Sequence, residues 1–299
     1  MRVQSEARPI AGPVNALSWS PDGRRVLAGG FEEAAVLDDR LVLKERVALP
    51  DDGQIWGTAW SADGKWIALA SEAGLTARLA GGGQLRRLAA NSALAVSFSP
   101  TAADILAAAF ADGTSILIDL SQANPTPMVL DAGGAPLVAI DWSPDGRRIA
   151  TGGLDALVHL WDVRTGKEQA KLDDVGRLDV NGLAWSADGH LLAAATQVGD
   201  IVLYDVDHQR LVKALSGAHG WSRGVTFDRA GNLVAGAGED GVVRVWRVSD
   251  WSLAATGKAT QDSVWSLAWS PIADRLASAG GRYQSRDGDT AVRTWAVNE

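Results

Sequence analysis

Residues 17–25 read Leu-Ser-Trp-Ser-Pro-Asp-Gly-Arg-Arg, and residues 140–148 repeat this stretch as Ile-Asp-Trp-Ser-Pro-Asp-Gly-Arg-Arg. Shorter copies begin at Trp60 and Trp185, and weaker ones elsewhere in the chain. We call the aromatic residue of each copy its anchor. The seven anchors are Trp19, Trp60, Phe98, Trp142, Trp185, Phe227 and Trp269. Successive anchors lie 38 to 44 residues apart. A period of this size is typical of a four-stranded propeller blade.

Each repeat also reads as short strands joined by tight turns. Apolar residues alternate along 14–19, and the Asp-Gly pair that follows is a strong hairpin signal. In the fourth repeat, further strands are expected over 148–151, 157–162 and 167–172. No stretch shows sustained helical periodicity. The sequence therefore predicts an all-β fold, a seven-bladed β-propeller of four-stranded antiparallel blades that forms a single domain over residues 1–299.

One position in the repeat is always occupied by a small residue. Three residues before the anchors stand Ala16, Gly57, Ala95, Ala139, Gly182, Gly224 and Ser266. Blades arranged radially crowd together near the central axis, where a large side chain on the innermost strand would collide with the neighbouring blade. The pattern favours a closed ring independently of the repeat length.

These repeats resemble the WD-repeat family over all seven units. The expected third strands end in Trp161, Trp246 and Trp295. An aspartate stands six residues before each of these tryptophans: Asp155, Asp240 and Asp289. The resemblance implies that this Asp bonds a loop His, which connects through Ser or Thr to the Trp. His219 is expected to supply such a histidine to Asp240, with Gly238 in place of the Ser. His159 is interpreted as a residue on the strand surface.

The resemblance also implies how the ring closes. The seventh repeat ends at Glu299 after its third strand, whereas a spare extended segment, 2–8, precedes the first anchor. We expect this amino-terminal segment to supply the outer strand of the last blade.

Composition excludes several classes of function. The 36 acidic and 28 basic residues give a net charge of −8, which argues against a generally basic nucleic-acid binder. The sequence contains no run of about 18 apolar residues, the length needed to span a membrane. The amino terminus lacks the apolar core of a signal peptide. The chain has no cysteine and no pair of histidines at metal-ligand spacing. We therefore expect a cytoplasmic monomer that uses neither cofactor nor metal and binds neither nucleic acid nor membrane.

Acidic residues gather in the loops that enter a blade and in the turns between its second and third strands. These segments share one face of a propeller, here named the top face. Four arginines stand there, Arg177, Arg223, Arg282 and Arg286, against 17 acids: Glu32, Glu33, Asp51, Asp52, Glu72, Asp112, Asp131, Asp155, Asp173, Asp174, Asp179, Asp200, Glu239, Asp240, Asp262, Asp287 and Asp289. Turns favour Asp for conformational reasons, which explains part of the excess. The remainder predicts a top face that attracts cationic partners.

The residues four positions before the anchors are expected at the top rim. They are Asn15, Trp56, Leu94, Val138, Asn181, Arg223 and Trp265, with Trp221 close to Arg223 in sequence. In the WD-repeat family this position commonly faces the channel mouth, and Trp and Arg are typical of binding hot spots. The alternative is that Trp56 and Trp265 pack between blades. The seventh repeat also carries seven extra residues within 281–287, including Arg282 and Tyr283. This insertion either contributes to binding or is a tolerated loop without a function.

The sequence therefore predicts a non-catalytic protein-interaction scaffold. The partner would be a peptide or protein, with a basic segment held on the acidic top face. Two alternatives remain at this point: a sensor domain of a larger signalling assembly, and a propeller enzyme that acts on a small substrate at the channel mouth. No catalytic motif in the sequence supports the enzyme.

Overall fold

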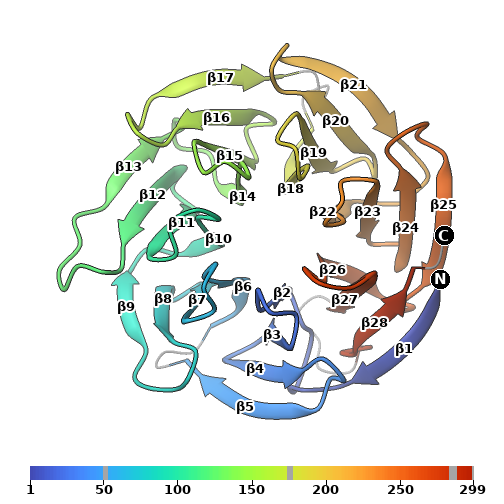
Figure 1. Ribbon diagram of the computed structural model, residues 1–299, viewed down its shortest axis with the longest axis horizontal. Helices are drawn as coiled ribbons and strands as arrows, with labels where there is room; N and C mark the ends of the chain where they lie inside the picture. The colour runs from blue at the N-terminus through green and yellow to red at the C-terminus, as the bar shows by residue number, and fades with distance from the viewer. Residues whose placement is uncertain (50–52, 174–177, 283–287, 298–299) are drawn as a thin grey trace.

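The computed structural model describes residues 1–49, 53–173, 178–282 and 288–297. Seven four-stranded sheets surround a central opening, each with one edge strand facing the opening (Figure 1). Every strand pair within a sheet is antiparallel. The predicted all-β, seven-bladed propeller is confirmed.

The strands of blades 1 to 4 are β2 (Ala16–Trp19), β3 (Arg25–Gly29), β4 (Glu33–Asp38), β5 (Leu43–Ala48); β6 (Ile55–Trp60), β7 (Trp66–Ser71), β8 (Gly74–Leu79), β9 (Arg86–Ala89); β10 (Ala93–Phe98), β11 (Ile105–Phe110), β12 (Thr114–Asp119), β13 (Met128–Asp131); β14 (Leu137–Trp142), β15 (Arg148–Gly153), β16 (Val158–Asp162), β17 (Glu168–Leu172). Those of blades 5 to 7 are β18 (Val180–Trp185), β19 (Leu191–Thr196), β20 (Ile201–Asp205), β21 (Arg210–Leu215); β22 (Ser222–Phe227), β23 (Leu233–Gly238), β24 (Val242–Arg247), β25 (Leu253–Lys258); β26 (Ser263–Trp269), β27 (Arg275–Gly281), β28 (Val292–Ala296) and β1 (Arg2–Ala7).

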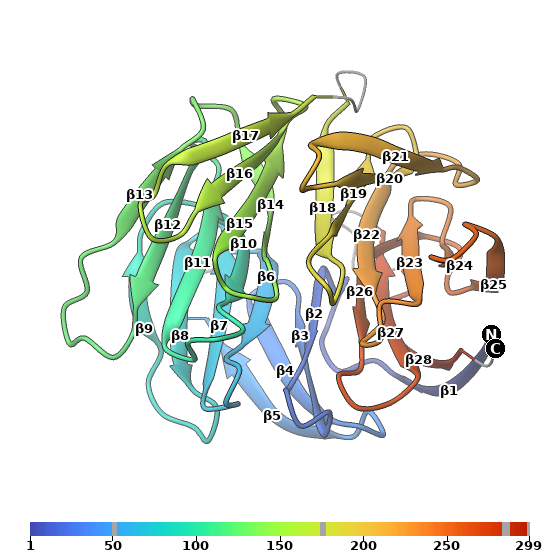
Figure 2. The same cartoon turned by 45° about the horizontal axis from the view of Figure 1, so that its top comes forward.

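The amino-terminal strand closes the ring as predicted. β1 pairs antiparallel with β28, with Val3 opposite Trp295 and Ala7 opposite Val292. In both cartoon views the two termini lie side by side at this blade (Figures 1 and 2). Glu6 adds an ion pair to Arg293 at 3.0 Å. The outer side of β28 is thereby paired with a strand from the other end of the chain, which gives the seventh blade four strands like the others.

The hydrophobic core is divided among the blade interfaces. Seven clusters of buried side chains occur, one between each pair of neighbouring blades, including one that joins blades 7 and 1. All seven anchors end an innermost strand and are at most 9% exposed. Two of them also bond across an interface: the Nε1–H groups of Trp19 and Trp142 donate to backbone carbonyls of the preceding blade, those of Ala268 and Ser97.

The small residues before the anchors have the predicted steric role. A Cβ added to Gly182 would lie 2.8 Å from the carbonyl oxygen of Arg223 on the next blade. A Cβ on Gly57 would lie 3.2 Å from Ala95. At the same position in blade 7, the hydroxyl of Ser266 accepts the backbone N–H of Leu17, so this side chain ties the last blade to the first. Innermost strands therefore approach too closely for any larger side chain.

The repeated Ser-x-Asp-Gly sequence builds the turn after each full anchor motif. In blade 1 the Ser20 hydroxyl donates to Asp22 (2.6 Å) and accepts the backbone N–H of Arg25 (2.9 Å). The bond from Ser20 lowers the pKa of Asp22. Gly23 has a φ of 63°, in the left-handed region that glycine tolerates. The same Ser–Asp bond recurs in blades 2, 4 and 5, which explains why this short motif marks the repeats so clearly.

The structure corrects two expectations about the polar motif. Gly236, rather than Gly238, occupies the Ser/Thr position of blade 6, because it pairs with Arg244 as Thr151 pairs with His159. The backbone N–H of His219 donates to Asp240 (3.2 Å), while its side chain is exposed. The loop histidine is thus replaced by a cation on the third strand: Arg244 pairs with Asp240 at 2.7 Å.

The interpretation of His159 as a surface residue is wrong. Its side chain is fully buried, with Nε2 2.6 Å from Asp155 and Nδ1 2.5 Å from Glu168. It occupies the position of Arg244 and of Arg293, which pairs with Asp289 at 2.8 Å. The outer strand β17 covers it and supplies Glu168. The Ser/Thr–Trp half of the motif is present in two blades, where Trp161 donates to Thr151 and Trp295 to Ser278.

Candidate functional site

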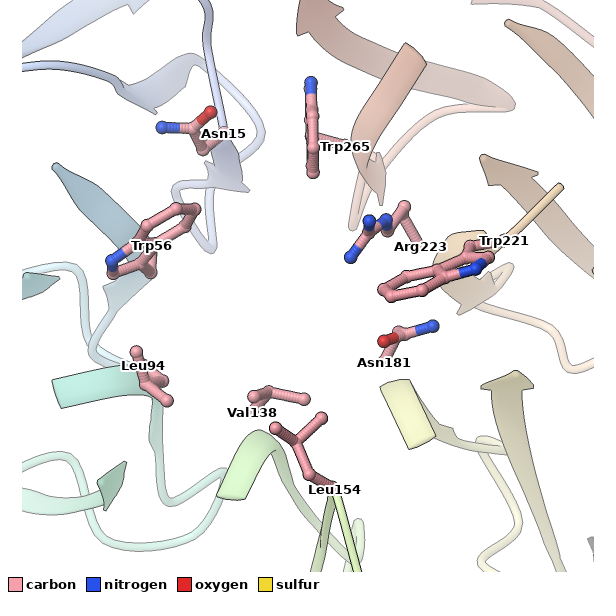
Figure 3. A pocket seen from close by; sticks show the side chains of 9 residues that line it. All are labelled: Asn15, Trp56, Leu94, Val138, Leu154, Asn181, Trp221, Arg223 and Trp265. Carbon is pink, nitrogen blue, oxygen red and sulfur yellow. The ribbon is translucent and has the colours of Figure 1, made fainter. Parts of the chain in front are cut away.

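A pocket of about 240 Å³ opens at the top end of the central channel (Figure 3). The seven residues that stand four positions before the anchors all line it, together with Leu154 and Trp221: Asn15, Trp56, Leu94, Val138, Asn181, Arg223 and Trp265. Each blade supplies one of the seven from the start of its innermost strand or just before it. We call this pocket the mouth. It is the arrangement that the sequence predicts for these positions.

One side of the mouth is built around Arg223. Its guanidinium carbon lies 4.3 Å from the ring centroid of Trp221 and 4.8 Å from that of Trp265, so the arginine stands between two indoles. Nη2 also pairs with Glu239 at 3.0 Å. Stacking and pairing fix the side chain, and cation–π contacts of this kind contribute about 0.5–2 kcal/mol each. The mouth therefore carries an ordered cation of its own, on a face of Trp265.

The opposite side of the mouth is apolar. Trp56, Leu94, Val138 and Leu154 lie there, across the opening from Arg223 (Figure 3). Leu154 belongs to the turn between β15 and β16, and is 47% exposed. Sequence reasoning missed it, because nothing in the repeat distinguishes this turn residue. Because Leu154 is exposed and has apolar neighbours, a ligand that covered it would gain hydrophobic binding energy.

The two asparagines of the mouth link neighbouring blades. Nδ2 of Asn15 donates to the carbonyl of Ile55 (3.2 Å), and Nδ2 of Asn181 donates to that of Ser222 (3.0 Å). Their amide N–H groups are thus engaged with the channel wall. In Figure 3 the side-chain oxygen of Asn181 points toward the opening, as an acceptor.

Trp56 and Trp265 are partly exposed at the mouth rather than buried between blades. The Nε1–H of Trp265 donates to the carbonyl of Gly281 (2.9 Å), which orients its ring. The structure therefore places both tryptophans where a ligand could reach them. Contact with a partner stays a prediction.

The predicted excess of acidic residues on the top face is smaller in the structure. The count made from the sequence covered loops and turns and therefore omitted cations that lie on strands. Arg46 pairs with Glu33 at 2.7 Å from a neighbouring strand. Arg244 and Arg293 neutralise two further top-face acids, as described above. Arg282, which the count included, lies 3.3 Å from Asp262. Tyr283, Asp51, Asp52, Asp174, Arg177, Arg286 and Asp287 lie outside the described residues. The exposed acids that remain include Glu72, Asp112, Asp131 and Asp173.

A single carboxyl stands apart from these turn acids. Asp141 precedes the anchor of blade 4, and its Oδ2 accepts the backbone N–H of Trp185 at 2.9 Å. Burial raises the pKa of Asp141 to about 7, because desolvation outweighs this bond and that from the backbone of Trp142.

A raised pKa makes Asp141 a source of pH dependence. The unfolded chain releases this proton near pH 4 and the folded protein near pH 7, so the group's destabilising effect grows between these values and is complete above pH 7. Replacement by Asn should therefore stabilise the protein increasingly from pH 4 to 7, by at most about 1.4 kcal/mol per pH unit. Urea denaturation of Asp141→Asn and wild type at pH 5 and pH 8 measures this. An equal stability difference at the two pH values would contradict it.

Comparisons with known proteins agree with this architecture. A model of the WD domain, G-beta repeat, matches residues 8–39, 128–162 and 209–247, and that of the anaphase-promoting complex subunit 4 WD40 domain matches 171–222. The chain contains WD repeats and folds as a seven-bladed propeller. Its match with cell division cycle 20.1, cofactor of APC complex, from Arabidopsis thaliana is 30% identical over 204 residues, 64% of this chain and 42% of that protein.

Other relatives carry the same repeats. Protein HIR1 of Cryptococcus neoformans var. neoformans serotype D (strain JEC21 / ATCC MYA-565) is 31% identical over 165 residues, 48% of this chain and 19% of that protein. The anaphase-promoting complex subunit cdc20 of Dictyostelium discoideum is 27% identical over 164 residues, 53% of this chain and 31% of that protein. The WD-repeat propeller thus aligns with less than half the length of each of these three relatives.

Two further features are absent from the described part of the propeller. Nowhere in it do three or more His, Asp or Glu residues group so that they could hold a metal ion. It likewise contains no helix that could span a lipid bilayer.

Proposed function

We propose that this protein is a non-catalytic interaction scaffold that holds a peptide segment of a protein partner in the mouth. The observation that carries the proposal is the mouth itself, where one residue from each blade meets in a pocket of about 240 Å³. Three tryptophans and an arginine in one pocket are the composition of an interface hot spot. Two of the relatives are named as a cofactor or subunit of a protein complex, which supports a protein partner by analogy.

We further propose that the bound segment is basic. Its cation would lie against Trp56, since Arg223 already stacks on Trp265. Glu72, Asp112 and Asp131 support this placement: they are exposed and belong to the top-face segments of blades 2, 3 and the entry to blade 4, on the side of the ring that supplies Trp56. Such carboxylates would mainly accelerate encounter with the partner, and salt would screen them beyond about 8 Å. The expected location remains the cytoplasm.

Peptides selected from a random library on the wild-type protein test both parts. Trp56→Ala should weaken binding of a selected peptide at least about tenfold, through faster dissociation, because the indole is a hot-spot side chain. Raising the salt concentration should lower the association rate. Surface plasmon resonance measures both rates.

The matched control is Trp66→Ala, in the same blade. Trp66 begins β7 away from the mouth, and its Nε1–H donates to Asp104 at 2.9 Å. Melting curves establish that each variant is folded. Unchanged affinity in a folded Trp56→Ala would refute the site, whereas selection of acidic or uncharged peptides would refute only the basic segment.

A further inference from the structure

A second cavity of about 240 Å³ lies at the opposite end of the innermost strands, between blades 3, 4 and 5. The mouth adjoins the starts of these strands and the anchors lie at their ends, so the two pockets are on opposite faces. Phe98, Trp142 and Trp185 line the cavity, with Asp141 and the partly exposed Pro144 and exposed Ala187. An aromatic cavity that holds one carboxyl differs from a simple apolar gap between blades.

The carboxyl is peculiar to this cavity. Residues directly before the other six anchors are uncharged and small: Ser18, Ala59, Ser97, Ala184, Thr226 and Ala268. Asp141 is partly exposed and makes no ion pair with any residue that the structure describes. A neighbouring cation, Arg148, stacks on Trp185 at 5.0 Å but directs its guanidinium toward Asp207 and the carbonyl of Gly189.

Backbone capping alone does not require a charged side chain. Oδ2 of Asp141 accepts the N–H of Trp185, which the channel edge of β18 would otherwise leave without an acceptor. An asparagine oxygen could accept the same bond without a carboxylate's desolvation. The backbone of Trp142 donates to the same carboxyl, and the remaining lone pairs are left for a further donor. A cation that brings its own charge would offset the cost of ionising this group.

We propose that this cavity binds the primary ammonium group of a lysine side chain from a protein partner. The ammonium donates to Asp141, and the parts of Phe98, Trp142 and Trp185 that line the cavity contact its alkyl chain. Lysine fits better than arginine, because the two backbone bonds already engage part of the carboxylate. A guanidinium prefers to bind both carboxylate oxygens. The site lies on the face opposite the mouth and does not depend on the function proposed there.

A second pocket on the same face of the propeller resembles this cavity but lacks the carboxyl. Between blades 7, 1 and 2, a pocket of about 290 Å³ is lined by Trp19, Trp60 and Trp269, with Ser18 at the place of Asp141. Aromatic lining and position in the repeat are alike, and the charge is absent. An ammonium that needs the carboxyl should enter the first cavity and not the second.

Titration with Nα-acetyl-lysine-N-methylamide, followed by the indole N–H resonances in ¹H–¹⁵N NMR spectra, tests the proposal. Saturable shifts are expected for Trp142 and Trp185, with little change at Trp19, Trp60 and Trp269. The Nε-acetylated form of the same probe, which has no charge, should not produce them. Asp141→Asn should weaken binding at least about tenfold while keeping the bond to Trp185, because a charge-assisted contact is lost.

A second pair of variants covers the case in which Asp141→Asn misfolds. Ala187→Leu should obstruct the cavity and abolish the shifts, whereas Ala62→Leu, at the equivalent place in the other pocket, should not. Equal binding by wild type and a folded Asp141→Asn, equal shifts with the acetylated probe, or no saturable shift in the wild type would each overturn the proposal.

Discussion

A protein that lacks residues 2–7 is expected to lose the whole propeller rather than one strand. These residues form β1, whose removal exposes the outer edge of β28 and its ladder of backbone groups. Several ladder hydrogen bonds at about 0.5–1.5 kcal/mol each are a large share of a stability of about 5–15 kcal/mol. The truncated protein should melt many degrees lower and aggregate, as thermal denaturation and size-exclusion chromatography would show.

A synthetic peptide with the sequence of residues 1–8 provides the control for this deletion. If β1 acts by pairing with β28, the peptide added in excess should restore part of the lost melting temperature. A peptide of the same composition in scrambled order should not restore it. An unchanged melting temperature without aggregation in the truncated protein would show that closure by β1 is dispensable.

Gly182→Val should destabilise the protein nearly as strongly. The Cβ alone would lie 2.8 Å from the carbonyl oxygen of Arg223, and that oxygen belongs to the backbone of β22, which cannot give way alone. Forcing the innermost strands of blades 5 and 6 apart would cost about 1–3 kcal/mol or more, the range found for overpacked cores. Chemical denaturation measures the free energy of unfolding.

Gly81→Val is the matched control for this substitution. A Cβ at Gly81 would meet no atom within 4 Å, so the change should leave the free energy of unfolding within about 0.5 kcal/mol. If Gly182→Val were equally harmless, the small residues before the anchors would not reflect crowding at the axis.

The repeat made the fold predictable because its signals are local. In blades 1, 2, 4 and 5 the anchor ends a strand, and the glycine of the next turn follows four residues later. The Ser two residues before the Asp holds each of these Asp-Gly turns, so one short motif encodes a whole hairpin. Ring closure by the amino-terminal strand followed from the family resemblance, together with the missing fourth strand of the last repeat. The resemblance to the WD-repeat family implied that the position four residues before the anchor faces the channel mouth, and the constant offset to the anchor identified this residue in every blade.

Contacts between side chains of different strands were beyond sequence reasoning. The sequence does not indicate that Arg223 stacks between Trp221 and Trp265, because Trp265 comes from the next blade. His159 was misplaced for a similar reason: Glu168, on the outer strand, both covers and bonds it. The acidity of the top face was overestimated because the cations that neutralise it sit on strands.

Hydrogen–deuterium exchange of the full chain, with and without a peptide selected as above, tests most directly whether the mouth is the binding site. Bound peptide is expected to slow exchange at the starts of β6, β22 and β26, around Trp56, Arg223 and Trp265, while the outer strands β9 and β25 remain unchanged. Slowed exchange confined to the outer strands or to the opposite face, with none at these three strand starts, would contradict the assignment of the mouth.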